Sequence, residues 1–524
     1  MRNRAPLAAP TRYDVCLEIE SMKRIALLIL TLAAPLAADV KPFALFGDHM
    51  VLQSGMSVPV WGTASPGERV GVTLNGQKRS ATASADGKWM VRLKNLKPGG
   101  PFQMTIAGNN TITVNDVLVG EVWLGSGQSN MAFTVSKKRA PYAGLVNEEQ
   151  EIAAANYPLV RMFTGKPAKT YEPQTEIKGE WLVCTPENAP GFSAVGYLFS
   201  RDLHRELKEP VGFLTLAFGA STAESWIRRE TVAADPLLKP MLDRFDAAVQ
   251  FYRANPNAPP SEAPKPPQTI NARPGPPPQR QRDPVQDQHN PTVLFNGMIN
   301  PAIPFAIRGA IWYQGESIVG GKEGVALYPH VMATLIADWR KLWGEGDFPF
   351  YVVQLPALGN ISNNPLVREG QADVLRLRRT AMAVTIDIGD PTDVHPHNKA
   401  PLGERLTKIA LANVYGRKLE YSGPVYKSMK VSGNAIRLTF SHAGGGLVAK
   451  DGPLKWFAIA GADGRFVPAE AKIEGDSVVV SSSAVSAPVA ARYAWDNYPE
   501  GCNLENAAGL PAAPFRTDRW PYEY

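Results

Sequence analysis

Near the N-terminal end, apolar residues recur in short runs with a spacing of two, and turn-forming residues separate the runs. Residues 89–93 alternate, and Asn75-Gly76 supplies the positive backbone angles that a tight hairpin turn requires. Several short strands at such spacing are typical of a β-sandwich. We therefore predict an N-terminal β-sandwich domain over residues 39–116.

The pattern changes after Val117, where apolar runs begin to alternate with longer stretches of helical period. Ser193 can cap one such helix, whose apolar face would include Val195, Leu198 and Leu203. Strand–helix alternation of this kind predicts an α/β domain over residues 117–422, with an open parallel sheet covered by helices on both faces. The predicted strands are residues 117–124, 211–217, 306–312, 350–355 and 382–387.

Two further segments depart from this alternation. Residues 254–291 are rich in proline, glutamine and arginine and poor in bulky apolar groups, which predicts an extended or disordered insertion that the chemistry does not need. From residue 423 to 524 turn-rich β-patterning returns, as in residues 435–440. A C-terminal β-domain is expected there.

The first 38 residues have the layout of a secretory signal. Met22-Lys23-Arg24 precedes a short apolar run and then small residues. The run is too short to span a bilayer stably, so no membrane span is expected once the signal is removed. These features predict export to the periplasm or the cell exterior. Met22 is an alternative start of translation.

Composition excludes some functions and leaves others open. The net charge of +6 is spread thinly, with no Lys and Arg cluster, which argues against nucleic-acid binding. Cys184 and Cys502 are too few for a structural zinc site, and their pairing stays open. No metal or organic cofactor is expected.

Polar, glycine-bearing segments follow four of the five predicted strands. Ligands of open α/β sheets bind at the carboxyl ends of the strands, so these segments should meet at one edge. They comprise residues 125–131, 218–222, 313–317 and 389–397.

Within these segments lie the parts of a nucleophilic site. Ser129 occupies a turn among small neighbours, but its hydroxyl needs a base. Of the seven histidines, only His395 and His397 follow a strand of the α/β region, and Asp393 can orient the imidazole ring of His395. Each residue also has an interpretation without a catalytic role. Ser129 could be an ordinary turn residue, His395 a loop residue and Glu316 a buried carboxylate.

These residues also form recognisable blocks. Gly127-Gln128-Ser129-Asn130, Gly219, Gln314-Gly315-Glu316 and Asp393-Val394-His395-Pro396 together resemble the SGNH hydrolases, in the branch of sialate O-acetylesterases and related carbohydrate acetylesterases. The resemblance covers nearly the whole chain after residue 38. It implies an SGNH-type, flavodoxin-like parallel sheet flanked by N- and C-terminal β-domains.

The resemblance further implies roles for individual residues. Ser129 would be the nucleophile, His395 its base and Asp393 the orienting carboxylate. The backbone N–H groups of Ser129 and Gly219, with the side chain of Gln314, would form the oxyanion hole.

Some assignments stay open. The spacing from Asp393 to His395 is one residue shorter than in the wider class, so Asp390 or Glu316 could be the true partner of His395, and Asn130 is a further supporting residue. The expected activity is removal of O-acetyl groups from an acetylated sugar or glycan, through an acetyl-serine intermediate. Sialic acid is the first candidate substrate and acetylated xylan or another plant polysaccharide the second. A non-catalytic carbohydrate-binding protein is the alternative of another class.

Overall fold

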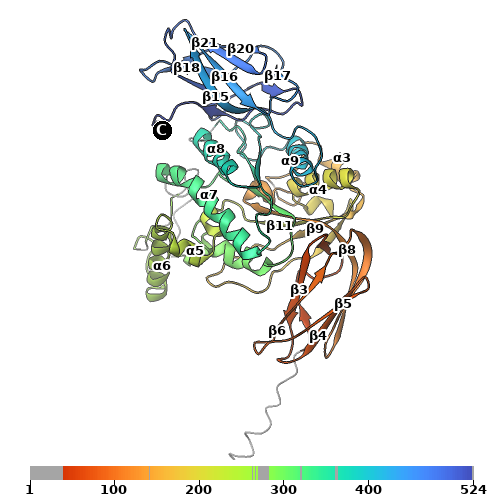
Figure 1. The fold of residues 1–524 in the computed structure, drawn as a ribbon. Helices are drawn as coiled ribbons and strands as arrows, with labels where there is room; N and C mark the ends of the chain where they lie inside the picture. The colour runs from red at the N-terminus through yellow and green to blue at the C-terminus, as the bar shows by residue number, and fades with distance from the viewer. Residues whose placement is uncertain are drawn as a thin grey trace, which may run out of the picture.

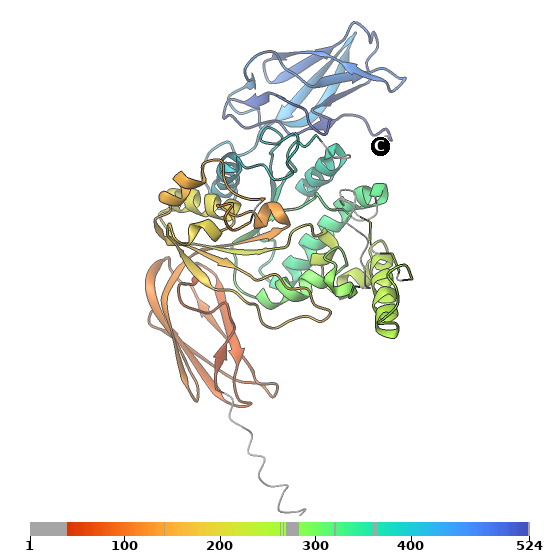
Figure 2. The same ribbon diagram turned by 180° about the vertical axis from the view of Figure 1, so that it is seen from behind.

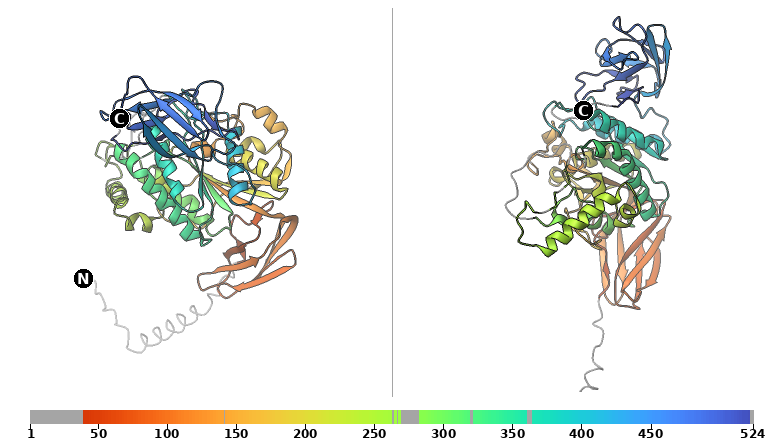
Figure 3. Two further views of the ribbon diagram at one scale, coloured as in Figure 1. Left: turned by 45° about the horizontal axis from the view of Figure 1, so that its top comes forward. Right: turned by 90° about the vertical axis from the view of Figure 1, so that its left-hand side faces the viewer.

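The computed structural model describes residues 39–140, 142–262, 264–265, 267–268, 282–318, 321–359 and 364–521. The predicted signal segment and the middle of the proline-rich insertion lie outside the described residues. In the part that is described, no helix is long and apolar enough to cross a membrane. The chain forms a central α/β body with one β-domain at each end (Figures 1 and 2). Figure 3 shows the same arrangement tilted by 45° and from the side.

The N-terminal strands form two sheets, one of order β1-β3-β6 and one in which β5, β4, β7 and β8 pair in turn, with β2 also pairing β8. The predicted alternation at residues 89–93 is confirmed, since Trp89, Val91 and Leu93 are buried while Met90 and Arg92 face solvent. The strands are β1 (Lys41–Pro42), β2 (Val51–Gln53), β3 (Ser57–Thr63), β4 (Arg69–Leu74), β5 (Gln77–Thr82), β6 (Lys88–Lys94), β7 (Gly99–Ala107) and β8 (Thr111–Gly127).

Strand β8 joins two parts of the fold. Its first half pairs antiparallel with β7, and its second half is a central strand of the α/β sheet. The predicted boundary between residues 116 and 117 therefore falls inside one continuous strand. Hydrophobic patterning could not indicate this, because an apolar strand has the same pattern in either sheet.

The central sheet has the order β10-β9-β11-β8-β12-β13-β14. Numbered among themselves, the five predicted strands β8, β11, β12, β13 and β14 lie in the order 2-1-3-4-5, and β9 and β10 extend the sheet beyond β11. The sheet is mixed rather than wholly parallel as predicted, because β10 runs antiparallel to β9. Strands β9 and β10 were not predicted, and β14 lies slightly before the predicted run. The bounds are β9 (Tyr157–Thr164), β10 (Trp181–Cys184), β11 (Val211–Ala217), β12 (Gly309–Tyr313), β13 (Phe350–Val353) and β14 (Thr380–Ala383).

Helices cover both faces of this sheet, with α4 packed against α9 and α7 packed against α8 (Figure 1). The predicted cap of α4 is confirmed, since the Ser193 hydroxyl accepts a hydrogen bond from the N–H of Gly196 at 3.1 Å. The helices are α2 (Ser129–Ala132), α3 (Glu148–Ala153), α4 (Ala194–Leu207), α5 (Arg229–Ala234), α6 (Lys239–Ala254), α7 (Gly321–Trp343), α8 (Asn364–Ala372) and α9 (Ala400–Asn413).

The C-terminal domain consists of short antiparallel strands around its own core, which includes Ile436, Leu438, Val478 and Val480. Its sheets have the orders β15-β16-β21-β20, β19-β18-β22-β24 and β17-β23. The strands are β15 (Val425–Ser432), β16 (Ala435–Ser441), β17 (Leu447–Ala449), β18 (Phe457–Ala460), β19 (Phe466–Pro468), β20 (Glu470–Glu474), β21 (Ser477–Ser481), β22 (Ala490–Tyr493), β23 (Leu504–Asn506) and β24 (Phe515–Arg516).

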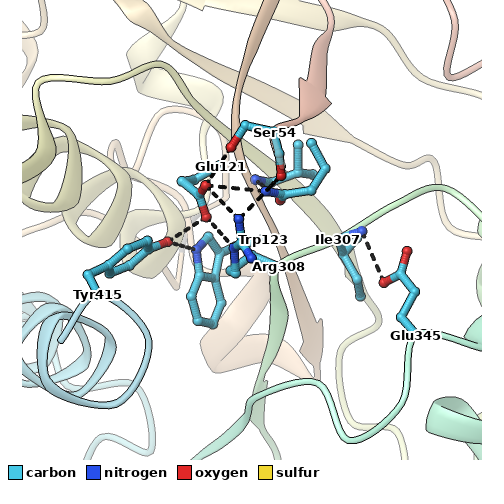
Figure 4. Close-up of polar contacts among 9 residues, drawn as sticks. Ser54, Glu121, Trp123, Ile307, Arg308, Glu345 and Tyr415 are labelled. Atoms are coloured by element: carbon cyan, nitrogen blue, oxygen red, sulfur yellow. Dashed lines mark hydrogen bonds and ion pairs between the residues drawn. The ribbon is translucent and has the colours of Figure 1, made fainter. Parts of the chain in front are cut away.

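Buried polar clusters join the two β-domains to the α/β body. At the N-terminal side, Glu121 of β8 accepts hydrogen bonds from Ser54 (2.8 Å), Arg308 (2.9 Å) and Tyr415 (2.8 Å), as Figure 4 shows. Burial alone would raise the pKa of Glu121, but the hydrogen bond and positive charge of Arg308 outweigh it and the pKa is lowered. The cluster lies at the amino ends of the central strands, away from the edge predicted to carry the site.

At the C-terminal side, the guanidinium group of Arg368 in α8 is fully buried. It donates hydrogen bonds of 2.8–2.9 Å to backbone carbonyl groups of the α/β body and of the C-terminal domain. The acceptors are Leu355 and Pro356 in the first and Asp496 and Asn497 in the second. A planar guanidinium can serve several acceptors at once, so one side chain satisfies four carbonyls of two loops. The C-terminal domain is thereby tied to the loop that follows β13.

Candidate active site

Ser129 lies where β8 ends and α2 begins, and it is partly exposed. The preceding turn is held against β12, because the N–H of Gln128 donates to the carbonyl of Tyr313 at 2.9 Å. Gly127 has a φ of +129°, and a Cβ there would lie 2.1 Å from the Tyr313 oxygen. Only glycine can occupy this position, so the local sequence and the neighbouring strand together hold the Ser129 turn in place.

His395 lies in the irregular loop after β14, and its side chain is mostly buried. Its Nε2 is 2.8 Å from the hydroxyl oxygen of Ser129, although 266 residues separate the two in sequence. The ring of Tyr142 packs against the imidazole with 4.7 Å between centroids. The structure thus brings the predicted nucleophile and base into hydrogen-bonding contact.

Asp393 is the carboxylate nearest to the other ring nitrogen of His395. Its Oδ1 is 3.5 Å from Nδ1 of His395 and accepts the backbone N–H of His395 at 2.8 Å. Its Oδ2 is 3.4 Å from Nε2 of His397, so the carboxylate is shared between two imidazoles. The 3.5 Å separation between Oδ1 of Asp393 and Nδ1 of His395 is long for a hydrogen bond. It is short enough for the carboxylate to form an ion pair with a protonated imidazole.

The two alternative carboxylates are engaged elsewhere. Asp390 accepts the backbone N–H groups of Thr392 and Asp393, each at 2.8 Å, and so shapes the turn that carries Asp393. Glu316 is buried and accepts from the side chain of Asn130 at 2.6 Å. Of the three carboxylates that the sequence left open, Asp393 alone is placed within ion-pair distance of His395 among the described residues.

The environment of His395 disfavours its protonated form. Burial lowers the pKa of His395 to about 4, and the positive charge of Lys399 acts in the same direction, while Asp393 acts against both. An imidazole of this kind is neutral at ordinary pH and can accept a proton from a hydroxyl group.

The backbones of Gly219 and Ser129, whose N–H groups are the predicted oxyanion donors, lie close together. Gly219 follows β11, and a Cβ built on it would lie 3.8 Å from the Cβ of Ser129. Within the described chain, neither the N–H of Gly219 nor that of Ser129 has a hydrogen-bond partner. Both are therefore available to a developing negative charge on a substrate oxygen.

Gln314, the third predicted oxyanion donor, is paired with protein groups in this structure. Its side-chain nitrogen donates to the carbonyl oxygens of Ser221 at 3.1 Å and Ser317 at 2.8 Å, which uses both of its N–H bonds. The hydroxyl of Tyr328 donates to its side-chain oxygen at 3.0 Å. As arranged, Gln314 holds together the loops that follow β11 and β12, and sequence patterns cannot reveal such partners.

Lys399, like Tyr142, lies near the site and was not identified by the sequence analysis. It is only 1% exposed, and its ammonium group donates to the side-chain oxygen of Asn130 at 2.8 Å. Its one signal in the sequence is its position four residues after His395. A lysine in a polar loop is usually solvated, so that signal is weak.

The end of the proline-rich segment packs beside the site. Val285 and Asn290 are buried, and the hydroxyl of Thr222 donates to the His289 carbonyl at 3.3 Å. Lys169 donates to the carbonyl of Gln286 and lies over the ring of Phe218, which precedes Gly219. This part of the predicted insertion is therefore packed structure. The composition of the segment does not indicate that Val285 is buried or that the carbonyls of Gln286 and His289 accept hydrogen bonds.

In the described part of the chain, no group of three or more His, Cys, Asp or Glu side chains is placed to hold a metal ion. Cys184 and Cys502 are both free cysteines.

Comparison with known proteins agrees with this chemistry. A family model described as "Carbohydrate esterase, sialic acid-specific acetylesterase" matches residues 287–412, which include Asp393 and His395. The sialate O-acetylesterase of Mus musculus is 30% identical over 94% of this chain and 97% of its own length. The sialate O-acetylesterase of Homo sapiens is 29% identical over 89% of this chain and 90% of its own.

A solved structure extends the likeness to three dimensions. The crystal structure of a carbohydrate acetylesterase from Xanthomonas citri is 35% identical and superposes with a TM-score of 0.78. The match covers 92% of this chain and all of the other chain. It therefore includes the two β-domains as well as the α/β body.

Proposed function

The chain belongs to the sialate O-acetylesterase family and is a carboxylic ester hydrolase, and on that premise we propose that it removes O-acetyl groups from sialic acids. We assign the chemistry to Ser129, His395 and Asp393. The observation that carries the assignment is the 2.8 Å contact between Ser129 and His395 at the carboxyl edge of the sheet. The order 2-1-3-4-5 of the five strands β8, β11, β12, β13 and β14, numbered without β9 and with Ser129 in the turn after β8, supports an SGNH-type, flavodoxin-like fold.

The mechanism is acyl transfer in two steps. Nε2 of His395 takes the proton of the Ser129 hydroxyl, and the oxygen attacks the acetyl carbonyl carbon. The oxyanion accepts hydrogen bonds from the N–H groups of Ser129 and Gly219. His395 returns the proton to the sugar oxygen, which leaves as an alcohol. His395 then takes a proton from water, whose oxygen attacks the carbonyl carbon of the acetyl-serine. The bond from that carbon to the Ser129 oxygen breaks, His395 returns the proton to this oxygen, and acetate leaves.

We also propose that the chain is exported. The basic residues at positions 23 and 24, followed by a short apolar run and small residues, support a cleavable signal within residues 1–38. Acetylated glycans outside the cell would then be the natural substrates.

Substrate preference is tested by acetate release from mono-O-acetylated sialic acids, acetylated xylan and acetylated pectin. We expect kcat/KM on an acetylated sialic acid to exceed that on xylan by about tenfold or more, a difference of about 1.4 kcal/mol in transition-state binding. Faster release from xylan would overturn the substrate and leave the esterase intact. Release from none of them would contradict the esterase and favour a carbohydrate-binding protein.

The pH dependence tests His395 as the base. Only neutral imidazole can accept the proton, and the pKa of His395 is lowered to about 4. We therefore expect kcat/KM to stay near its maximum down to about pH 5 and to fall with a midpoint near 4, well below the ordinary value of about 6.5. Circular dichroism at each pH separates loss of activity from loss of fold. A midpoint near 6.5 in a folded enzyme would contradict this environment of His395.

A further inference from the structure

Lys399 is a buried cation that the mechanism above does not use. It precedes the first turn of α9, and its ammonium group lies over the rings of Phe133, at 4.4 Å from the centroid, and Tyr313, at 5.4 Å. Its hydrogen-bond acceptor is the side-chain oxygen of Asn130, at 2.8 Å. Burying an ammonium group is costly, and an apolar side chain would fill the same space more cheaply. The position therefore calls for an explanation beyond packing.

Glu316 lies on the other side of the same amide. Its carboxylate accepts from the side-chain nitrogen of Asn130 at 2.6 Å, and that nitrogen also donates to the backbone carbonyl of Val394 at 3.0 Å. An ammonium group can only donate, whereas a carboxylate and a carbonyl can only accept. The partners therefore fix the orientation of the amide, with its oxygen toward the cation and its nitrogen toward the anion.

The amide connects the two catalytic segments. Asn130 directly follows Ser129, and Val394 directly precedes His395. A single buried side chain thus ties the turn of the nucleophile to the loop of the base. Displacement of the amide would change the 2.8 Å contact between Ser129 and His395.

We propose that Lys399 is a positioning residue, which with Glu316 clamps the Asn130 amide between the catalytic segments. This inference rests on the proposed function, because it assigns His395 the role of base. It adds a group that acts through Asn130, without touching the substrate.

Several charged or titratable groups act on His395. Asp393 favours the protonated ring, whereas Lys399 and His397 disfavour it. The ring of Tyr142 packs against the imidazole, and the Ser129 hydroxyl contacts Nε2. Burial lowers the pKa of Lys399 to about 7, and the charge of Glu316 acts against that change. Lys399 is therefore cationic throughout the acidic range in which His395 would take up a proton.

The test compares Lys399→Met with wild type in acetate release, pH profile and thermal unfolding. Methionine keeps the length of the side chain and removes the charge and the donor. We expect kcat to fall about tenfold with KM changed less than twofold, because the lost interaction orients the reacting groups. We expect the acid midpoint of kcat/KM to rise by about half a pH unit or more, because the cation that opposes protonation of His395 is gone.

Lys408→Met is the matched control, since Lys408 lies on the same helix and pairs with Glu404 at the surface. It should leave kcat and the acid midpoint unchanged. If Lys399→Met is poorly folded, the double variant Lys399→Met/Glu316→Gln removes both buried charges together and keeps an acceptor for Asn130. The double variant should fold and still show the lower kcat and the raised midpoint.

The outcomes separate this inference from the proposed function. A folded Lys399 variant with the kcat and acid midpoint of wild type would overturn the inference. Unfolding of both variants would also overturn it, because the pair would then be structural. Failure of the proposed function has a different signature, in which wild type itself releases no acetate or Ser129→Ala releases as much as wild type.

Discussion

Ser129→Ala is expected to yield a folded protein that releases acetate about a thousandfold or more slowly than wild type. The substitution removes the oxygen that would form the acetyl-serine, and only substrate binding and the oxyanion donors would remain to accelerate hydrolysis. Ser129 is partly exposed and its hydroxyl contacts His395, so its loss should cost little stability. Initial rates of acetate release at saturating substrate, with thermal unfolding in parallel, measure both effects.

Ser126 provides the matched control. It lies three residues earlier in β8, fully buried, and its hydroxyl has no hydrogen-bond partner among the described residues. Ser126→Ala should keep kcat within about twofold of wild type, because it removes one unpaired hydroxyl away from the reacting atoms. Retention of more than about a tenth of the wild-type rate in Ser129→Ala would exclude Ser129 as the nucleophile.

Asp393→Asn is expected to lower kcat/KM by well over tenfold. The carboxylate lies 3.5 Å from Nδ1 of His395, where it can orient the ring and stabilise the imidazolium that forms during proton transfer. An amide keeps the shape and removes the charge. The carboxylate is 40% exposed, so solvent weakens its influence and the loss should be smaller than that in Ser129→Ala.

The two other carboxylates allow the assignment to be tested by comparison. Asp390→Asn should cost less, since an amide oxygen can still accept the N–H groups that shape the turn. Glu316→Gln should also cost less than Asp393→Asn, because Glu316 contacts Asn130 and reaches His395 only indirectly. If Glu316→Gln proved the most damaging, Glu316 would be the functional carboxylate and Asp393 an ordinary turn residue.

Several features could be predicted because they depend on neighbouring residues. The alternation at residues 89–93 predicted a strand, and Ser193 predicted the start of α4. The polar segments after the strands indicated Ser129 and His395, since parallel strands bring their carboxyl ends to one edge wherever the chain passes in between. The catalytic roles of these residues stay predictions until the variants are measured.

Other features required the tertiary structure, because they depend on partners distant in sequence. Whether the N–H bonds of Gln314 are free is decided by the carbonyls of Ser221 and Ser317, and the sequence does not indicate that contact. The continuation of β8 through two sheets and the extra strands β9 and β10 likewise follow from pairing.

Lys399 makes the physical reason plain. The sequence shows a lysine four residues after His395, but it does not show whether the side chain is solvated or buried. Its burial depends on Asn130, Glu316 and the aromatic rings around it. Residue type determined which chemistry each segment could offer. Only the packing of segments far apart in the chain decided which N–H groups remain unpaired, which charged side chains are buried, and which groups lie together at the site.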